Sequence, residues 1–358
     1  MPMQKNKLDF SNQNVYAGFD VHLKTWKVSV MVNDIHHKTF SQDPSPQQLF
    51  RYLSENFPSA NYFTAYEAGF CGFWIHQELE KLGVNSIVVN PADIPTTGKE
   101  TRQKEDKRDS LKIVKSLRAG LLQPIYTPTE ENLEDRALIR LRFSASKDLA
   151  RAKNRIKSYL YFMGIEIPPD YQKQSKSFTR SYLKWLEELT ISERSKSNLR
   201  IYIKQATQAN DTKKYVSAQL KNLLESPKYY KDYQLIRTVA GIGVVSAATF
   251  LLEIENIHRF ITLDHFCSFI GLVPSTKSSG EKEKIGGITK RRNRILRAIL
   301  VEAAWVAIRR DPALMKKYFD LKKRMNENRA IIRIAKSLAA RILFVLKNQK
   351  EYEFRHVK

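Results

Sequence analysis

The sequence has little cysteine. Only Cys71 and Cys267 occur among 358 residues, which do not make a disulfide framework and fit a reducing compartment. A zinc site built from Cys267, His258 and His265 would have a spacing that matches no zinc-finger pattern. Because 42% of the residues are hydrophobic, a chain of this length can form two or three domains around real cores.

Long apolar runs are also missing. No segment approaches the roughly 18 consecutive apolar residues that a membrane-spanning helix needs. The amino-terminal segment MPMQKNKLDFSNQN lacks the apolar stretch of a secretory signal. We therefore expect a cytoplasmic protein that is neither secreted nor inserted in a membrane.

Acidic residues are scarce relative to basic ones. The chain has 61 Lys and Arg against 37 Asp and Glu, which gives a formal net charge of +24. Such an excess is costly in self-repulsion unless a polyanion neutralises it, and nucleic acid is the commonest polyanion. A membrane surface is the rival partner, but a membrane binder usually places its charge beside an apolar anchor. The charge therefore favours a protein that binds nucleic acid and, in a prokaryote, associates with the nucleoid.

The first third of the chain alternates between strand and helix patterns. Segments rich in β-branched and aromatic residues predict strands at 14–22, 26–33, 38–40, 61–69 and 84–90. Helical apolar spacing predicts helices at 45–57, 73–83 and 106–122. The order β-β-β-α-β-α-β-α starts antiparallel and continues with crossover units, so we predict a mixed α/β sheet.

The middle of the chain has a different pattern. No proline or glycine interrupts residues 130–163, and apolar residues recur every three or four positions, at Leu138, Leu141, Ala145, Leu149, Ala152, Ile156, Leu160 and Met163. This pattern predicts one helix about 45 Å long with basic residues on its other faces. A second helical stretch runs from about Ser192 to Glu225, and the pair is typical of an antiparallel coiled-coil arm. The alternatives are a plain helical hairpin packed on the body and an arm that dimerises.

Four carboxylates of the first region are candidates for a metal site. Asp20 and Glu67 end the first and fourth predicted strands, and Asp106 and Asp109 share nearly one face at the start of a helix. In a mixed sheet of this order the first and fourth strands are neighbours, so the four acids would converge at one edge. Hard divalent cations prefer such oxygen clusters, and two ions about 4 Å apart can assist phosphoryl transfer.

Each acid also has a purely structural interpretation. Asp106 is a good helix N-cap, Asp109 favours the helix dipole, Asp20 could be a solvated strand end and Glu67 could pair with a lysine. His22 could act as a base, but a local hydrogen-bonding role is the simpler interpretation. The set as a whole indicates function, because these are the positions that ribonuclease H-like nucleases use for their acids.

The segment 236–254, IRTVAGIGVVSAATFLLEI, frames one apolar residue between Gly241 and Gly243. Two glycines so placed favour a helix-hairpin-helix, in which backbone N–H groups grip a phosphate without reading bases. Ordinary packing between two helices is the alternative. The remainder of the chain is expected to be helical, with predicted helices at 301–310 and 330–349.

The segment Lys277–Arg294, KSSGEKEKIGGITKRRNR, joins two serines to a run of cations. Between residues 271 and 300 there are eight Lys or Arg and two Glu, a local net charge of +6. A solvated basic loop is the plain interpretation, and a phosphate-contacting loop with a nucleophilic serine is the functional one. We expect its nucleic-acid contacts at Lys277, Gly280, Lys282, Lys284, Lys290, Arg291, Arg292 and Arg294, in addition to Gly241 and Gly243.

Together these segments resemble the insertion-sequence 110 family of DEDD transposases and the related Piv-type DNA invertases. GFDVH, YEAG and EDKRD resemble the family's RuvC-like half. TVAGIGVVSAATFLLEIENIHRF, FIGLVPSTKSSGEKEKIGGITKRRNRILRAILVEAAW and AKSLAARILFVLKNQKEY resemble its transposase half. The resemblance puts the acidic tetrad on Asp20, Glu67, Asp106 and Asp109 and the serine nucleophile on Ser279, although Ser278 is adjacent.

The resemblance implies a function and an organisation. It implies an RNase H/RuvC-like domain at 1–128, a coiled-coil arm at 129–228 and a helical transposase domain at 229–358. Mg²⁺ or Mn²⁺ on the tetrad would assist a serine recombinase that cuts and rejoins donor and target DNA as a dimer or tetramer. A structured guide RNA, the bridge RNA, would choose sites by base pairing. The alternatives are a Holliday-junction-type endonuclease without a covalent intermediate and a non-catalytic nucleic-acid scaffold.

Overall fold

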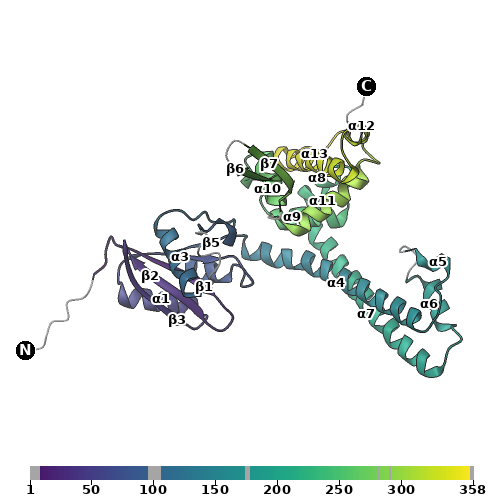
Figure 1. Ribbon diagram of the computed structural model, residues 1–358, viewed down its shortest axis with the longest axis horizontal. Helices are drawn as coiled ribbons and strands as arrows, with labels where there is room; N and C mark the ends of the chain where they lie inside the picture. Colours follow the sequence, from purple (N-terminus) through teal and green to yellow (C-terminus); the bar gives the residue numbers. More distant parts are fainter. Residues whose placement is uncertain (1–8, 96–105, 174–177, 280–281, 290–291, 355–358) are drawn as a thin grey trace, which may run out of the picture. The chain divides into compact units, whose positions relative to one another are not determined.

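A computed structural model describes residues 9–95, 106–173, 178–279, 282–289 and 292–354 (Figure 1). At 106–108, 275–279 and 282–285 it describes the backbone only. The chain divides into two compact units, Met1–Pro128 and Thr129–Lys358. No helix in the described ranges is long and apolar enough to cross a membrane.

The first unit is built on a five-stranded sheet. Its strands are β1 (Asn14–Val21), β2 (Trp26–Val32), β3 (Ile35–Gln42), β4 (Asn61–Glu67) and β5 (Asn85–Val89), in the spatial order β3-β2-β1-β4-β5. The first three strands pair antiparallel, whereas β1–β4 and β4–β5 pair parallel. The predicted mixed α/β sheet is confirmed, including the contact between its first and fourth strands. The third strand was predicted too short, because its residues are mostly exposed and lack an apolar pattern.

Helices cover both faces of this sheet. The helices α1 (Pro46–Asn56) and α2 (Trp74–Lys81) pack their leucines and isoleucine against Phe19, Val28 and Tyr66. The helix α3 (Asp106–Arg118) covers the other face, where Ile113 packs with Ala65 and Val89. Successive strand residues therefore serve two cores, as the alternation of a pleated strand requires. A short 3-10 turn, η1 (Pro91–Asp93), follows β5.

Gly18 explains how closely α3 approaches the sheet. A Cβ at this position would lie 2.3 Å from the backbone nitrogen of Val114 and 2.8 Å from the carbonyl oxygen of Ser110. The Ser110 hydroxyl also lies 2.9 Å from the buried Ser29 hydroxyl of β2. Only a glycine in β1 allows the helix backbone to lie directly on the strand.

The second unit begins with two long helices, α4 (Glu130–Phe162) and α7 (Glu193–Leu224), close to the predicted bounds. Ile156 and Leu160 share a core with Leu199, whereas Ile139, at the other end of α4, shares a core with Leu220. The two helices are therefore antiparallel. The short helices α5 (Pro169–Gln172) and α6 (Arg180–Glu187) lie between them in the chain and were not predicted.

One predicted core position on α4 is wrong. Leu141 is 51% exposed, whereas Ile139 is fully buried. Ile139 packs in the core of the helical body, whereas Ala152, Ile156 and Leu160 pack in the separate core that contains Leu199. A single periodic stripe could not describe both environments.

The remaining helices form a body around α13 (Glu327–Asn348), whose Ile334, Leu338 and Ile342 are fully buried. Its other elements are α8 (Tyr230–Arg237), α9 (Val244–Ile254), η2 (Ile257–Arg259), α10 (Leu263–Ile270), α11 (Arg294–Ala307) and α12 (Pro312–Lys322). The sequence pattern did not predict α12, and it placed the start of α11 about two turns too late.

The basic segment is a hairpin, so its prediction as a loop is wrong. The strands β6 (Pro274–Ser279) and β7 (Lys282–Ile288) pair antiparallel, with Ser279 opposite Lys282 and Lys277 opposite Lys284. Few apolar residues occur in these strands, so the hydrophobic alternation that usually indicates a strand is missing.

Candidate catalytic and nucleic-acid-binding residues

Asp20 and Glu67 end two neighbouring parallel strands. The last register pair of β1 and β4 is Phe19 with Tyr66, and the two acids are the next residues of their strands. Phe19 and Tyr66 face the core under α1 and α2, so the pleat puts Asp20 and Glu67 on the α3 face. Both residues are only partly buried. The sheet register therefore brings these two acids together, as the sequence predicted for strand neighbours.

His22 is a local partner of Asp20. Its Nε2 lies 3.1 Å from Oδ2 of Asp20, and the histidine side chain is 49% exposed. This contact confirms the interpretation of His22 as a local hydrogen-bonding residue.

The start of α3 lies on the same face as these acids. Asp106 is its first residue, and Asp109 precedes Ser110, whose carbonyl oxygen approaches Gly18. Gly18 is two residues before Asp20 on β1, so the first half of α3 packs near the carboxyl-terminal half of β1. The Asp106 side chain lies outside the described atoms. Among the side chains that are described, no three His, Cys, Asp or Glu group closely enough to hold a metal ion.

The donor chemistry of this region nevertheless fits a hard cation. Asp20, Glu67 and Asp109 offer carboxylate oxygens, which are the ligands that Mg²⁺ and Mn²⁺ prefer. The positions are partly open to solvent, so ions that keep several waters could be accommodated.

Zinc at Cys267 is not supported. Cys267 is fully buried in the helical core beside Phe266 and Ile270. Burial raises the pKa of its thiol to about 11, which disfavours the thiolate that zinc requires. Cys267 is a core residue.

Gly241 and Gly243 have different surroundings. Gly241 has a φ of +85°, and a Cβ there would lie 2.3 Å from the carbonyl oxygen of Ala303 in α11. Gly243 is exposed, and a Cβ at its position would meet no described atom within 4 Å. Its N–H donates to the Ser246 hydroxyl at 2.8 Å. Gly241 is therefore required by close packing and backbone conformation, whereas Gly243 caps α9 at the surface.

The hairpin register sorts its positions into two faces. Cross-strand partners lie on the same face and successive residues alternate. Positions 277, 279, 282 and 284 therefore share one face, and they are Ser279 and three lysines. Position 278 shares the other face with Glu283. Gly280, Lys290 and Arg291 lie outside the described residues, and Arg292 and Arg294 are exposed at the start of α11.

Three residues at the base of this hairpin were not singled out from the sequence. Arg297 donates to two backbone carbonyls, Asn293 caps α11, and Glu253 accepts from both Asn293 and Arg140. An Asn directly before a helical pattern is a recognisable N-cap signal. The partners of Arg297 and Glu253 are distant in sequence, so no local pattern indicates their roles.

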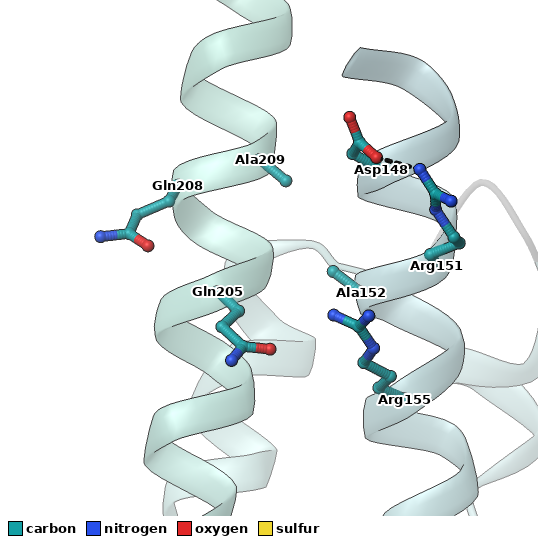
Figure 2. Close-up of a pocket in the computed structure, with 7 residues that line it drawn as sticks. All are labelled: Asp148, Arg151, Ala152, Arg155, Gln205, Gln208 and Ala209. Carbon is teal, nitrogen blue, oxygen red and sulfur yellow. Dashed lines mark hydrogen bonds and ion pairs between the residues drawn. The ribbon is translucent and has the colours of Figure 1, made fainter. Parts of the chain in front are cut away.

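A basic groove lies between α4 and α7 (Figure 2). It has a volume of about 460 Å³ and is lined by Asp148, Arg151, Ala152, Arg155, Gln205, Gln208 and Ala209. Arg151 is paired with Asp148, and Arg155 lies one turn further along α4. The small Ala152 and Ala209 leave space between the helices, and two guanidinium groups beside it are suited to phosphate oxygens.

Comparison with known proteins gives the class. Residues 17–164 match a transposase family model of the DEDD type, and residues 233–320 match the model of the Transposase IS116/IS110/IS902 family. The four candidate acids fall within the first match, and all candidate residues from Gly241 to Arg294 fall within the second. The chain belongs to the IS110 family of transposases.

Individual relatives agree with this assignment. The chain is 25% identical over 307 residues to the transposase for insertion sequence element IS1533 of Leptospira borgpetersenii, covering 82% of this chain and 85% of that protein. It is 29% identical over 243 residues to y4qE of Sinorhizobium fredii, which is named as a transposase. That match covers 68% of this chain and only 58% of the relative's length.

One solved structure shares a limited likeness. RuvC of Thermus thermophilus matches 31% of this chain and 99% of its own, with 14% identity and a TM-score of 0.23. A score this low does not by itself establish a shared fold.

Proposed function

We propose that this protein is a DNA transposase that cuts and rejoins strands with a metal-binding acidic tetrad and a serine nucleophile. The observation that supports the proposal is the parallel register of β1 and β4, whose last pair, Phe19 with Tyr66, is followed in each strand directly by an acid, Asp20 and Glu67. The family assignment and the net charge of +24 support DNA as the substrate.

In this proposal the first unit is an RNase H/RuvC-like catalytic domain, residues 1–128. Asp20, Glu67, Asp106 and Asp109 would hold Mg²⁺ or Mn²⁺. The bound cation would polarise the scissile phosphate and stabilise its developing charge. The carboxylates come from two strand ends and one helix start, so the sheet and the Gly18 contact would fix their separation.

Ser279 would be the nucleophile. Its Oγ would attack phosphorus, forming an Oγ–P bond while the P–O bond to the departing strand breaks and leaves a hydroxyl end. The phosphoserine would conserve the bond energy, so a strand hydroxyl could later displace the serine without ATP. The hairpin register supports Ser279 over Ser278, because only position 279 shares its face with Lys277, Lys282 and Lys284. These cations would neutralise charge on the phosphate.

The remaining parts would hold nucleic acid and partners. We propose that residues 129–228 form a coiled-coil arm that supports a dimer or tetramer. Residues 229–358 would form the transposase domain, with Gly243 in a helix-hairpin-helix that contacts phosphates. A structured guide RNA would choose the DNA sites, because a basic surface reads backbone and shape while base pairing reads sequence.

The serine assignment is tested with Ser279→Ala and Ser278→Ala. Each variant is incubated with substrate DNA and Mg²⁺, and the protein–DNA adduct is measured on a denaturing gel. We expect no adduct from Ser279→Ala and a normal adduct from Ser278→Ala. An adduct that persists in Ser279→Ala would refute the assignment.

Two other functions give different results. A Holliday-junction-type endonuclease would cut normally in both serine variants and fail only in acidic variants. A non-catalytic scaffold would keep every activity in Asp20→Asn. The guide RNA is tested separately by sequencing RNA that copurifies with the protein. Recovery of one structured RNA encoded beside the gene is expected, and recovery of only bulk cellular RNA would contradict it.

A further inference from the structure

Both ends of the β6–β7 hairpin contact one side chain. Nη1 of Arg297 donates to the carbonyl oxygen of Gly271 at 2.9 Å and to that of Thr289 at 2.8 Å. Gly271 precedes β6 by three residues, and Thr289 follows β7 directly. One guanidinium therefore holds the chain where it enters the hairpin and where it leaves it.

Backbone hydrogen bonds close the same base. The Thr289 N–H donates to the Val273 carbonyl at 3.0 Å, and the Asn293 N–H donates to the Phe269 carbonyl at 3.1 Å. The Asn293 side chain also accepts from the N–H groups of Ile295 and Leu296 at 3.1 Å, which starts α11. The exit of the hairpin is thus fixed both to α10 and to the first turn of α11.

A buried carboxylate extends this arrangement to α4. The Glu253 side chain is 1% exposed and accepts from the Asn293 amide at 2.9 Å. Arg140 of α4 donates to both of its oxygens, at 2.8 and 3.1 Å. A buried carboxylate needs hydrogen-bond donors of this kind. Glu253 therefore links Asn293, at the exit of the hairpin, to Arg140 of α4.

Arg297 differs from its basic neighbours. Arg292 and Arg294 are exposed, whereas Arg297 is half-buried and directs its donors to carbonyls of its own chain. Burial, together with the charge of Arg292, lowers the pKa of Arg297, but an arginine in this setting still carries its charge. The Arg297 guanidinium therefore binds backbone carbonyls, whereas an arginine that contacts phosphate would direct its donors to the solvent-exposed surface.

We propose that Arg297 is a positioning residue that fixes the base of the β6–β7 hairpin and thereby sets where Ser279 is presented. The proposal rests on the proposed role of Ser279 as nucleophile. An isolated two-stranded hairpin is marginally stable in water, so its orientation depends on how its ends are held. A misplacement of about 1 Å can cost roughly 100-fold in rate, so a loose base would slow the chemistry without removing any reacting group.

The test uses Arg297→Gln, with Arg309→Gln as control. Arg309 is exposed near the end of the same helix, so both variants lose one positive charge from α11 or its end. The first measurement is amide hydrogen exchange at Thr289 and Asn293, which requires no activity. We expect about tenfold to 100-fold faster exchange at these amides in Arg297→Gln, because two charge-assisted hydrogen bonds are lost. Exchange should be as in the wild type at the buried α13 amides of the same variant, and at Thr289 and Asn293 of Arg309→Gln.

The second measurement separates positioning from binding. Single-turnover formation of the protein–DNA adduct should be about 10 to 100 times slower in Arg297→Gln. The DNA dissociation constant should stay within about twofold and its salt dependence should not change, whereas loss of a phosphate contact lowers the log–log salt slope by about 0.9. A reduced slope with unchanged exchange at Thr289 would overturn the proposal and make Arg297 a phosphate contact.

Failure of this inference differs from failure of the proposed function. If Ser279→Ala still forms the adduct, the nucleophile is wrong, whatever the exchange data show. If Ser279→Ala is inactive but Arg297→Gln exchanges and reacts like wild type, only the positioning role is wrong. Should Arg297→Gln not fold, Arg297→Lys keeps the charge. Its exchange at Thr289 should still be faster than wild type, because a flexible ammonium holds two carbonyls less rigidly than a planar guanidinium. Wild-type exchange in the lysine variant would overturn the proposal.

Discussion

The two units hold their candidate residues by different physical means. In the first unit, Asp20 and Glu67 follow Phe19 and Tyr66, which are fully buried strand residues. Their positions are set by a sheet with helices on both faces. In the second unit, Ser279 lies at the end of a strand in a two-stranded hairpin, and polar side chains hold the base of that hairpin.

The difference matches what the proposed chemistry would require of each unit. Carboxylates that share metal ions must keep their separation to a fraction of an ångström, and a packed sheet provides that rigidity. A nucleophile that must reach a phosphate in a large substrate benefits from a projecting element with a fixed base. We therefore expect substitutions in the first unit to act through the core or the ligands, and substitutions in the second to act through hydrogen bonds at the hairpin base.

The largest effect is expected from Asp20→Asn. This change removes one anionic group of the proposed metal site, near the end of β1, without changing the size of the side chain. Because metal stabilisation of a phosphoryl transition state is worth several kcal/mol, DNA cleavage should fall by about 10³-fold or more. DNA binding, measured by fluorescence anisotropy without divalent metal, should be retained or slightly tighter, because a negative charge is lost.

Asp43→Asn is the control for this prediction. Asp43 is an exposed acid between β3 and α1 in the same unit, so it matches the charge change away from the strand ends. Equal cleavage by Asp20→Asn and wild type would remove the acids from the mechanism and favour a scaffold function.

The next effect concerns two glycines that lie against helix backbones, one in each unit. A Cβ at Gly241 would lie 2.3 Å from the Ala303 carbonyl oxygen, and the alanine would also have to adopt a φ of +85°. At Gly18 an added Cβ would clash with the backbone of α3, but the backbone conformation causes no strain. Gly241→Ala should therefore destabilise the protein by about 2 to 5 kcal/mol, and Gly18→Ala by about 1 to 3 kcal/mol. Urea unfolding measures the loss, and hydrogen exchange should locate it in α11 for the first and in α3 for the second.

Two other glycines provide the controls. A Cβ at Gly69 would come no closer than 3.9 Å to the Glu67 carbonyl oxygen, and one at Gly243 has open space around it. Gly69→Ala and Gly243→Ala should each cost less than about 1 kcal/mol. If Gly243→Ala nevertheless weakens DNA binding at unchanged stability, the proposed phosphate contact at this turn is supported. A large loss of stability in Gly243→Ala would mean that the turn is packed more tightly than its exposure indicates.

The sequence predicted helices and strands best where burial imposes a regular spacing of apolar residues. Runs of β-branched and aromatic residues placed β1 and β4, and Asp20 and Glu67 are candidates because they lie near the ends of these strands. The absence of proline and glycine from 130–163 gave α4 nearly to its bounds. These features depend on residues that are close in sequence, so local pattern and final structure agree.

The hairpin and its base could not be found in the same way. Its strands pair through backbone groups and contain few apolar residues, so no alternation indicates them. The partners of Arg297 are carbonyls at Gly271 and Thr289, and every residue type has a carbonyl. Gly241 looked like a phosphate-contacting glycine, whereas its contact with Ala303, more than sixty positions later, gives it a packing role.

The smallest effects are expected in the groove between α4 and α7, where cations lie on rigid helices rather than on a hairpin. Arg155→Gln should lower the log–log salt slope of nucleic-acid binding by about 0.9, with an affinity loss of less than about tenfold. Arg151→Gln should do less, because Asp148 already pairs with this guanidinium and competes with a phosphate. Arg200→Gln removes an equal charge from the exposed surface of α7 outside the groove and is the control. Equal salt slopes for all three variants would mean that α4 and α7 attract nucleic acid only through their overall charge. A decrease in slope that is largest for Arg155→Gln, smaller for Arg151→Gln and smallest for Arg200→Gln would identify the groove as a contact site.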